Sequence, residues 1–391
     1  MAVGTYIPSL GNIFEAHGLE SYALPAVFIT FSIGSMVSPI FIGTLADRGV
    51  PANRLLTYLL AVGGSIMLLS SFAVAHHWGA VWVVACFLVQ SIACSPVWSL
   101  VTSVVFSQLK DPQKQYPIIR VWGTIGWMIT GVMVSFMLKG DKSAITIAVA
   151  GFMLLGEGLF CAFVLPEIRM GDIKTPRRVS WRDLFGMDAW HLLRNPGHRT
   201  VFLSAALFGI PLAAFYQYSA SFLKDLGNTA PAASMSMGQV SEMIAMLLLP
   251  ALMLKLRLKW IMMIGLGCGI LRYGLYLVAS IVHFPVLAVG GVFFHGFTLT
   301  FFFIVGQLYV EREIDHSLRA EAQGLYQFCN GGIGPALGAI ICGLWYEGCK
   351  QWFPTDFWTW YWSGLTTFIG LIALWFNFTY QRNTPKTTVK P

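Results

Sequence analysis

Long apolar segments separated by short polar loops dominate this chain of 391 residues. Eleven of them reach the length of about 20 residues that an α-helix needs to cross the hydrocarbon core of a bilayer. Charged residues make up only 11% of the chain, far below the roughly 25% of soluble domains. The sequence therefore predicts an all-α, multi-pass membrane protein, with candidate spans at 22–46, 54–75, 79–108, 117–138, 144–165, 200–223, 230–254, 260–282, 285–309, 322–345 and 357–379.

The stretch 1–14 is also apolar, but it is too short to cross a bilayer alone. We interpret it as the second half of a further helix, which precedes the eleven full spans. Two explanations stay open: the start codon is misplaced and the true product begins upstream of Met1, or the first helix is truncated. The pattern predicts twelve transmembrane helices in all.

Basic residues are distributed unevenly between two sets of alternate loops. The set that begins with loop 47–54 and ends with the C-terminal tail holds nineteen Lys and Arg, whereas the other set holds four. Because cytoplasmic loops carry an excess of Lys and Arg, we predict that both termini are cytoplasmic, which agrees with an even helix count. The basic residues lie in short loops between spans, so the net charge of +7 does not indicate nucleic-acid binding.

The longest loop falls midway along the chain and carries seven of those basic residues. Its stretch 181–193 mixes apolar and charged residues at helical spacing, which predicts an amphipathic helix on the membrane surface. Two six-helix halves with a binding site near the membrane midplane are a known transporter plan. The predicted organisation is an N-terminal six-helix bundle (1–165), a basic linker (166–199), a C-terminal six-helix bundle (200–380) and a cytoplasmic tail (381–391).

The sequence gives no sign of a metal site, a cofactor or an enzyme. Its seven cysteines form no CxxC pair and have no histidines at ligand spacing, so neither a zinc site nor a disulfide framework is indicated. HExxH, GxSxG and nucleotide-binding motifs do not occur. We therefore expect neither a cofactor nor enzymatic activity.

An amide and a carboxylate, Gln239 and Glu242, interrupt the segment 230–254, which holds no other charge. Residues three apart share a helix face, and a carboxylate in hydrocarbon is costly enough that it usually faces a protein interior or a water-filled path. Burial also disfavours the charged form, which suits a proton carrier. We predict that Glu242 binds substrate or proton; the alternative is a structural ion pair with Arg120 or Arg272.

Arg120, Thr124 and Trp127 fall at positions i, i+4 and i+7, so they share one face of a helix. This face offers a forked cation, a hydroxyl group and a large ring, which predicts binding of a ligand that has hydroxyl or carbonyl groups and a planar part. The alternative is an arginine that extends to the cytoplasmic interface, because Arg120 lies near the start of its span.

Glu157, Arg272 and His295 complete the ionisable residues inside the spans. Glu157 and His295 are further candidates for proton coupling, with helix packing and an ordinary buried histidine as the alternatives. Arg272 is predicted to be the partner of a buried acid, because a buried charge needs compensation. Tyr216 and Gln217 lie in the middle of a span, whereas aromatic belts lie at span ends, so we predict that they line a cavity.

Several motifs allow the chain to be compared with known transporters. Gly43, Asp47 and Arg48 form Gly-x-x-x-Asp-Arg at a predicted helix end, which we interpret as a conformational latch; the motif resembles the loop signature of the major facilitator superfamily. Further motifs resemble the bacterial nucleoside:proton symporters: Ile119-Arg120-Val-Trp-Gly-Thr124-Ile-Gly126, Gly186-Met-Asp188, Gly238-Gln239-x-Ser-Glu242, Leu271-Arg272-Tyr, and Val310-Glu311-x-Glu313 followed by Arg319-Ala-x-Ala-Gln323-Gly324.

The resemblance runs collinearly over about 28–375. It implies a major facilitator fold in the bacterial inner membrane and a protein that imports nucleosides with protons by alternating access. We expect the protein to be a monomer. The family's binding residues carry over onto Arg120, Thr124, Gln239 and Glu242, and Trp127 stands where phenylalanine is usual.

Two departures from the family pattern concern the substrate. Amides of the seventh helix are replaced around Ala213 and Tyr216, with Gln217 as a candidate substitute, and an acid of the tenth helix is absent at Thr300. Two alternatives therefore stay open: a symporter for another polar cyclic solute such as a sugar, and a membrane receptor that has lost transport.

Overall fold

The chain folds into helices, and no strand occurs among the residues that the structure describes. This computed structural model describes residues 2–47, 50–108, 112–168, 187–315 and 319–383. The N-terminal half consists of α1 (Ala2–Tyr6), η1 (Ile7–Ser9), α2 (Leu10–Ala16), α3 (Ala23–Asp47), α4 (Ala52–Ala75), α5 (Ala80–Gln108), α6 (Pro112–Val132), η2 (Met133–Met137) and α7 (Ile145–Phe163).

The C-terminal half follows a linker whose described part forms a short 3-10 helix, η3 (Met187–Arg194). It consists of α9 (Pro196–Asp225), α10 (Pro231–Met235), α11 (Met237–Lys255), α12 (Leu258–Val282), α13 (Pro285–Thr298), η4 (Leu299–Ile304), α14 (Val305–Glu313), α15 (Arg319–Gln327), η5 (Phe328–Ile333), α16 (Gly334–Trp352) and α17 (Phe357–Asn383). The segments η2, η4 and η5 are π-helical turns that continue the helices around them.

All eleven predicted spans coincide with apolar helices among the described residues, and nine of them are confirmed as membrane spans by length and composition. Nine helices in the described part of the chain are long and apolar enough to cross a bilayer, and Ala23–Met36 and Val121–Met137 are shorter apolar helices. Helices are the expected outcome, because a chain in lipid must satisfy its backbone hydrogen bonds within the segment. The amphipathic helix predicted over 181–193 is described only from Met187, where the chain is 3-10 helical and not α-helical.

The N-terminal stretch forms a broken helix in three short pieces, α1, η1 and α2. The break coincides with Pro8, which lies at the start of η1 and lacks a backbone N–H. The piece packs closely: a Cβ added at Gly4 would lie 2.6 Å from Cγ of Trp127, and one at Gly11 would lie 3.0 Å from the carbonyl oxygen of Gln217. These residues therefore bring α1 against α6, and α2 against α9.

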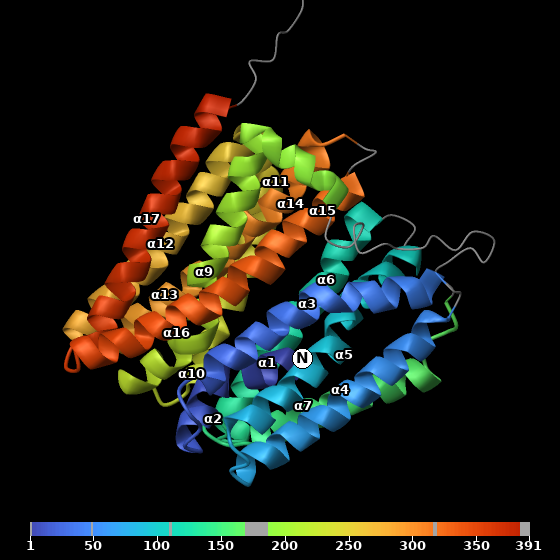
Figure 1. The fold of residues 1–391 in the computed structure, drawn as a ribbon, viewed down its shortest axis with the longest axis vertical. Coiled ribbons are helices and arrows are strands. Elements are labelled where there is room, and N and C mark those ends of the chain that lie inside the picture. The colour runs from blue at the N-terminus through green and yellow to red at the C-terminus, as the bar shows by residue number, and fades with distance from the viewer. Residues whose placement is uncertain (1, 48–49, 109–111, 169–186, 316–318, 384–391) are drawn as a thin grey trace, which may run out of the picture.

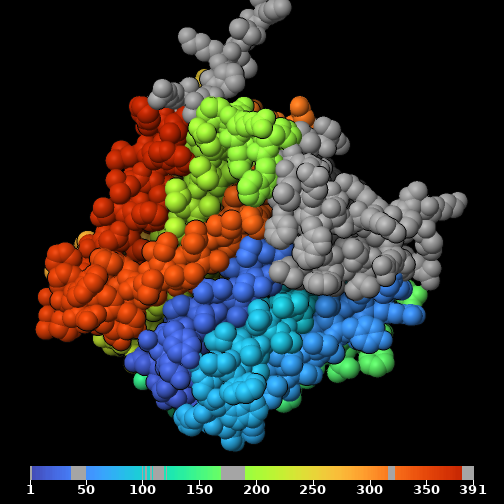
Figure 2. Space-filling model, in the orientation of Figure 1, coloured from blue at the N-terminus to red at the C-terminus, as the bar shows by residue number. Residues whose placement is uncertain are grey.

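The two halves form separate helix groups that meet along α3 and α16 (Figure 1). Figure 2 shows α16, in orange, lying against the blue N-terminal helices. The contact is close because glycines of the C-terminal half face α3: a Cβ at Gly343 would lie 2.7 Å from Pro25, and one at Gly332 would lie 2.8 Å from Met36. This seam places α9 of one half opposite α6 of the other.

Candidate functional site

A cavity of about 260 Å³ lies between the two halves. The N-terminal half contributes Trp127 of α6 together with Phe28 and Phe31 of α3, and the C-terminal half contributes Tyr216 and Ala213 of α9. This volume is near the lower end of small-molecule pockets, which begin at roughly 300 Å³. Two residues that the sequence predicted as ligand-binding, Trp127 and Tyr216, thus line one cavity from opposite halves.

A buried hydrogen-bonded chain of three side chains leads from Tyr216 into the C-terminal half. The Tyr216 hydroxyl lies 3.2 Å from Nε2 of His295, and Nδ1 of the same ring lies 3.0 Å from Nη1 of Arg272. His295 is 1% exposed and Arg272 is 0% exposed. The ring of Phe215 stacks on His295 with centroids 4.0 Å apart and planes at 7°, so the imidazole is held between neighbours on several helices.

The partner of Arg272 differs from the one that the sequence predicted. We expected a buried acid, but the described residues place no carboxylate within ion-pair distance of Arg272, and its hydrogen-bond partner is His295. Its guanidinium also lies over the rings of Phe215 and Tyr273, at 5.0 and 4.4 Å from their centroids. Aromatic faces attract cations electrostatically, so these rings compensate part of the buried charge.

Glu242 comes close to the hydrogen-bonded side chains of Tyr216, His295 and Arg272 because α11 and α13 cross without side chains between them. A Cβ at Gly296 would lie 2.5 Å from Cα of Glu242, and the Gly296 N–H donates to Oγ of Ser241 at 3.0 Å. On the other side of the crossing, a Cβ at Gly238 would lie 3.3 Å from Cβ of His295. Glu242 is 5% exposed, so the acid of α11 is buried beside the helix that carries His295.

Gln239 and Thr124 lie on two helices, one from each half, that pack against each other. Thr124 is half-buried on α6, Gln239 is half-buried on α11, and α6 packs against α11. The side chains of Arg120 and Asp47, and Arg48 as a whole, lie outside the residues that the structure describes, as does any contact of the predicted latch at Gly43. Their predicted roles therefore stay predictions.

Some buried polar atoms of the C-terminal half lack a partner among the described residues. They are the amide nitrogen and oxygen of Gln217, Nε and Nη2 of Arg272, and the hydroxyl of Thr300. A buried donor or acceptor without a hydrogen bond costs about 1–3 kcal/mol. Such groups are uncommon in proteins, and each one calls for a partner or a functional explanation.

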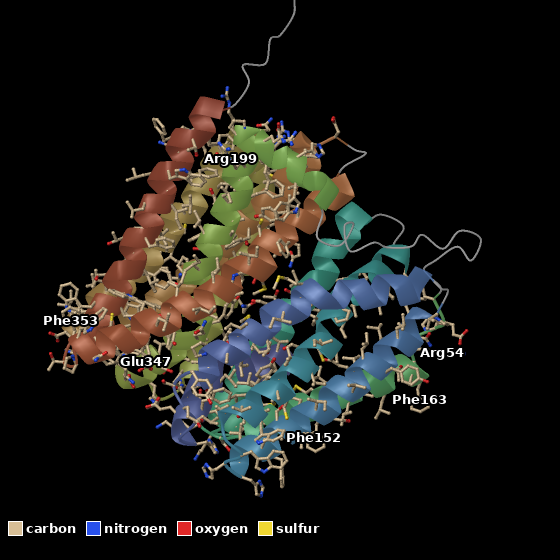
Figure 3. The ribbon with its side chains drawn as sticks, viewed as in Figure 1. Arg54, Phe152, Phe163, Arg199, Glu347 and Phe353 are labelled. Atoms are coloured by element: carbon tan, nitrogen blue, oxygen red, sulfur yellow. The ribbon has the colours of Figure 1, made fainter. Side chains whose placement is uncertain are left out.

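The halves are joined by polar contacts at the end where α9 leads into α10, which we call the far end. Glu15 of α2 pairs with Lys224 of α9 at 2.5 Å, and the N–H of Ala232 donates to Asp141 at 2.9 Å. Figure 3 labels Glu347 at this end, where it lines a second cavity of about 190 Å³ with Glu15. Polar contacts between the halves therefore join them at the far end.

A comparison with protein families accounts for this arrangement. The family described as "Nucleoside H+ symporter" matches residues 1–385. The chain belongs to this family. It is therefore a transporter and not an enzyme, it couples nucleoside import to protons, and it is a multi-pass protein of the inner membrane.

Relatives of this nucleoside H⁺ symporter are found in Escherichia coli (strain K12). The putative nucleoside transporter YegT is 27% identical over 372 residues, which cover 91% of this chain and 85% of the relative. The nucleoside permease NupG is 27% identical over 375 residues, with coverages of 91% and 87%. The xanthosine permease is 27% identical over 408 residues, with coverages of 98% and 94%.

Solved structures show the same fold for the symporter. The crystal structure of the nucleoside transporter NupG superposes with a TM-score of 0.82 at 25% identity and covers 97% of this chain and 96% of that one. A bacterial homologue of the human lysosomal transporter Spinster superposes with a TM-score of 0.71 at 12% identity, covering 98% and 94%. The predicted major facilitator fold is thereby confirmed.

Sequence reasoning missed part of the candidate site. Phe215 was not singled out, because one more apolar ring in an apolar span carries no signal. Gly238 and Gly296 were not predicted to bring α11 and α13 together, although small residues at helix interfaces are typical of membrane proteins. Glu157, which was predicted as a proton-coupling candidate, is exposed on α7 and does not line the cavity.

Proposed function

We propose that the symporter binds its nucleoside in the cavity between Trp127 and Tyr216. The observation that carries this proposal is that these two rings, one from each half, line the same space. A planar base binds well between aromatic faces, and stacking on such a ring is worth about 1–3 kcal/mol per base. Alternating access needs a site that both halves share, and this cavity meets that condition.

The ribose is assigned to the polar residues at the interface of α6 and α11. Thr124 and Gln239 are half-buried there, and Glu242 is buried one turn beyond Gln239. Arg120 precedes Thr124 by one helical turn, so it belongs to the same face. Gln217 supplies a buried amide whose nitrogen and oxygen have no partner among the described residues. A hydroxyl-rich sugar offers both donors and acceptors to such groups.

Glu242 is the first candidate for the proton site. It is a buried carboxyl on the same helix face as Gln239, next to the chain of Arg272, His295 and Tyr216. His295 is a second candidate, because an unperturbed imidazole titrates near neutral pH, but its contact with Arg272 disfavours a second proton on the ring. Glu157 is the least favoured candidate for the proton site, because it is exposed and does not line the cavity.

We assign the orientation from the charge of the loops. We place both termini in the cytoplasm, because the loops on that side hold nineteen Lys and Arg. Arg54 and Arg199 mark the cytoplasmic ends of the two halves on this assignment, and Figure 3 shows them on separate arms. The far end then faces the periplasm. The protein acts as a monomer within the lipid bilayer.

Uptake into proteoliposomes tests the proposal. We expect labelled nucleoside to accumulate when a proton gradient is imposed and only to equilibrate without one. Glu242→Gln keeps the shape of the side chain but cannot ionise, so accumulation should collapse while the protein still folds and inserts. Glu157→Gln is the matched control and should accumulate nucleoside as the parent does. Normal accumulation by Glu242→Gln would remove that residue from coupling, and a parent that transports only sugars, or nothing, would overturn the function itself.

A further inference from the structure

The direction of the hydrogen bonds from Arg272 to Tyr216 determines what the cavity recognises. We propose that the Tyr216 hydroxyl is a hydrogen-bond donor to the substrate base, so that it selects nucleosides with an acceptor atom, a carbonyl oxygen or an unprotonated ring nitrogen, at one position of the base. This inference rests on the proposed function, because it assumes that the nucleoside occupies the cavity lined by Tyr216.

The direction is set first by the chemistry of arginine. A guanidinium carries N–H donors and no acceptor, so in the 3.0 Å contact with Nη1 of Arg272 the Nδ1 atom of His295 must accept. Nδ1 therefore carries no proton. A doubly protonated ring would point an N–H at the arginine and place two cations in contact, which the buried position disfavours.

The second step follows from the tautomer. A neutral imidazole has one N–H and one acceptor nitrogen, so the proton of His295 resides on Nε2. Nε2 then donates to the Tyr216 hydroxyl oxygen, 3.2 Å away. The stacking of Phe215 at 4.0 Å fixes the plane of the ring, and the contact with Arg272 fixes which nitrogen accepts.

The third step concerns the proton of Tyr216 itself. Its oxygen already accepts from His295, and within the described residues the hydroxyl has no second hydrogen-bond partner. The O–H therefore has a proton to donate, and we direct it to the cavity, because Tyr216 is half-buried and lines that space. The other lining rings, Trp127, Phe28 and Phe31, make this the aromatic part of the cavity, where a planar base binds and the ribose does not.

Nucleosides that lack one acceptor atom test the inference. Binding to the purified parent and to Tyr216→Phe is measured by calorimetry in detergent. The probes are adenosine with its 1-deaza, 3-deaza and 7-deaza analogues, and uridine with the pyrimidin-2-one and pyrimidin-4-one ribosides. Together these analogues remove each ring-nitrogen or carbonyl acceptor of the two bases in turn. Tyr276→Phe, which removes the hydroxyl of a buried tyrosine outside the cavity lining, is the matched control.

The expected result is a loss of discrimination in one variant only. The parent and Tyr276→Phe should bind one analogue about 5- to 100-fold more weakly than its natural nucleoside, the range for one hydrogen bond. Tyr216→Phe should bind the nucleoside and that analogue equally. If Tyr216→Phe keeps the discrimination of the parent, or loses affinity by the same factor for every probe, the inference is wrong. A parent that binds no nucleoside contradicts the proposed function instead.

Discussion

We expect Gly296→Ala to weaken nucleoside binding by forcing α13 away from α11. The added Cβ would lie 2.5 Å from Cα of Glu242 and would also overlap the backbone nitrogen of that residue. Non-bonded carbons approach to about 3.5–4.0 Å, so the two backbones must separate by roughly 1 Å or more. The atoms involved belong to helix backbone and cannot move aside as a flexible side chain would. The shift would displace Glu242 relative to His295, which directly precedes Gly296.

The size of the effect follows from this overlap. Overpacking a well-packed interior costs about 1–3 kcal/mol, and alanine recovers up to about 1 kcal/mol through its helix preference over glycine. The net loss of stability is therefore about 0–2 kcal/mol, so the variant should fold. Loss of one buried hydrogen bond to the ligand costs about 1–3 kcal/mol, which corresponds to roughly 5- to 100-fold weaker binding.

Gly290→Ala is the matched control, because it lies on the same helix and its Cβ would meet no atom nearer than Cδ1 of Leu275 at 3.8 Å. Thermal unfolding in detergent and calorimetric binding of adenosine and uridine are measured for both variants. The control should match the parent or unfold slightly higher. If Gly296→Ala binds nucleoside as tightly as Gly290→Ala, the close crossing of α11 and α13 does not position the site.

Two further variants test the aromatic lining of the cavity and the contacts at the far end. Trp127→Ala should weaken nucleoside binding roughly 5- to 100-fold, because stacking contributes about 1–3 kcal/mol per base. Trp122→Ala, which removes a ring that is 69% exposed on the same helix, should leave nucleoside binding unchanged. Equal effects of the two substitutions would contradict stacking of the base on Trp127. Lys224→Met removes the ion pair with Glu15, and a partly exposed pair is worth about 0–1 kcal/mol. Labelling of Ser221→Cys by an impermeant thiol reagent should then rise by at most about fivefold, and a fall in labelling would refute the role of this pair.

The fold could be predicted from the sequence because the bilayer is a simple solvent. Each span is recognisable as a stretch of about 20 apolar residues, and the distribution of Lys and Arg among the loops predicts the orientation in the membrane. The eleven spans were found within a few residues, and the midway basic loop separated the halves. The linker was less predictable: a spacing that suits an amphipathic helix does not decide between α-helix and the 3-10 helix of Met187–Arg194.

The candidate site was predictable where a residue is unusual for its surroundings. The carboxyl group of Glu242 is unusual in an apolar span, because a charge in hydrocarbon is costly. The rings of Trp127 and Tyr216 and the hydroxyl of Tyr216 are unusual because they lie inside spans. Trp127 and Tyr216 do line one cavity. The sequence distinguished the roles of Glu157 and Glu242 only weakly. A single acid in an apolar span has the same sequence pattern whether its side chain faces a cavity or the outside of the protein.

What the sequence determined by itself was thus the order and approximate extent of the apolar helices, together with a short list of polar residues inside them. What only the tertiary structure decided was which of these residues meet. Arg272 bonds to His295 and not to an acid, and Glu242 lies beside α13 because Gly296 has no side chain. The physical reason is that hydropathy acts on each span separately, whereas these contacts depend on how closely, and at which residue, distant helices cross.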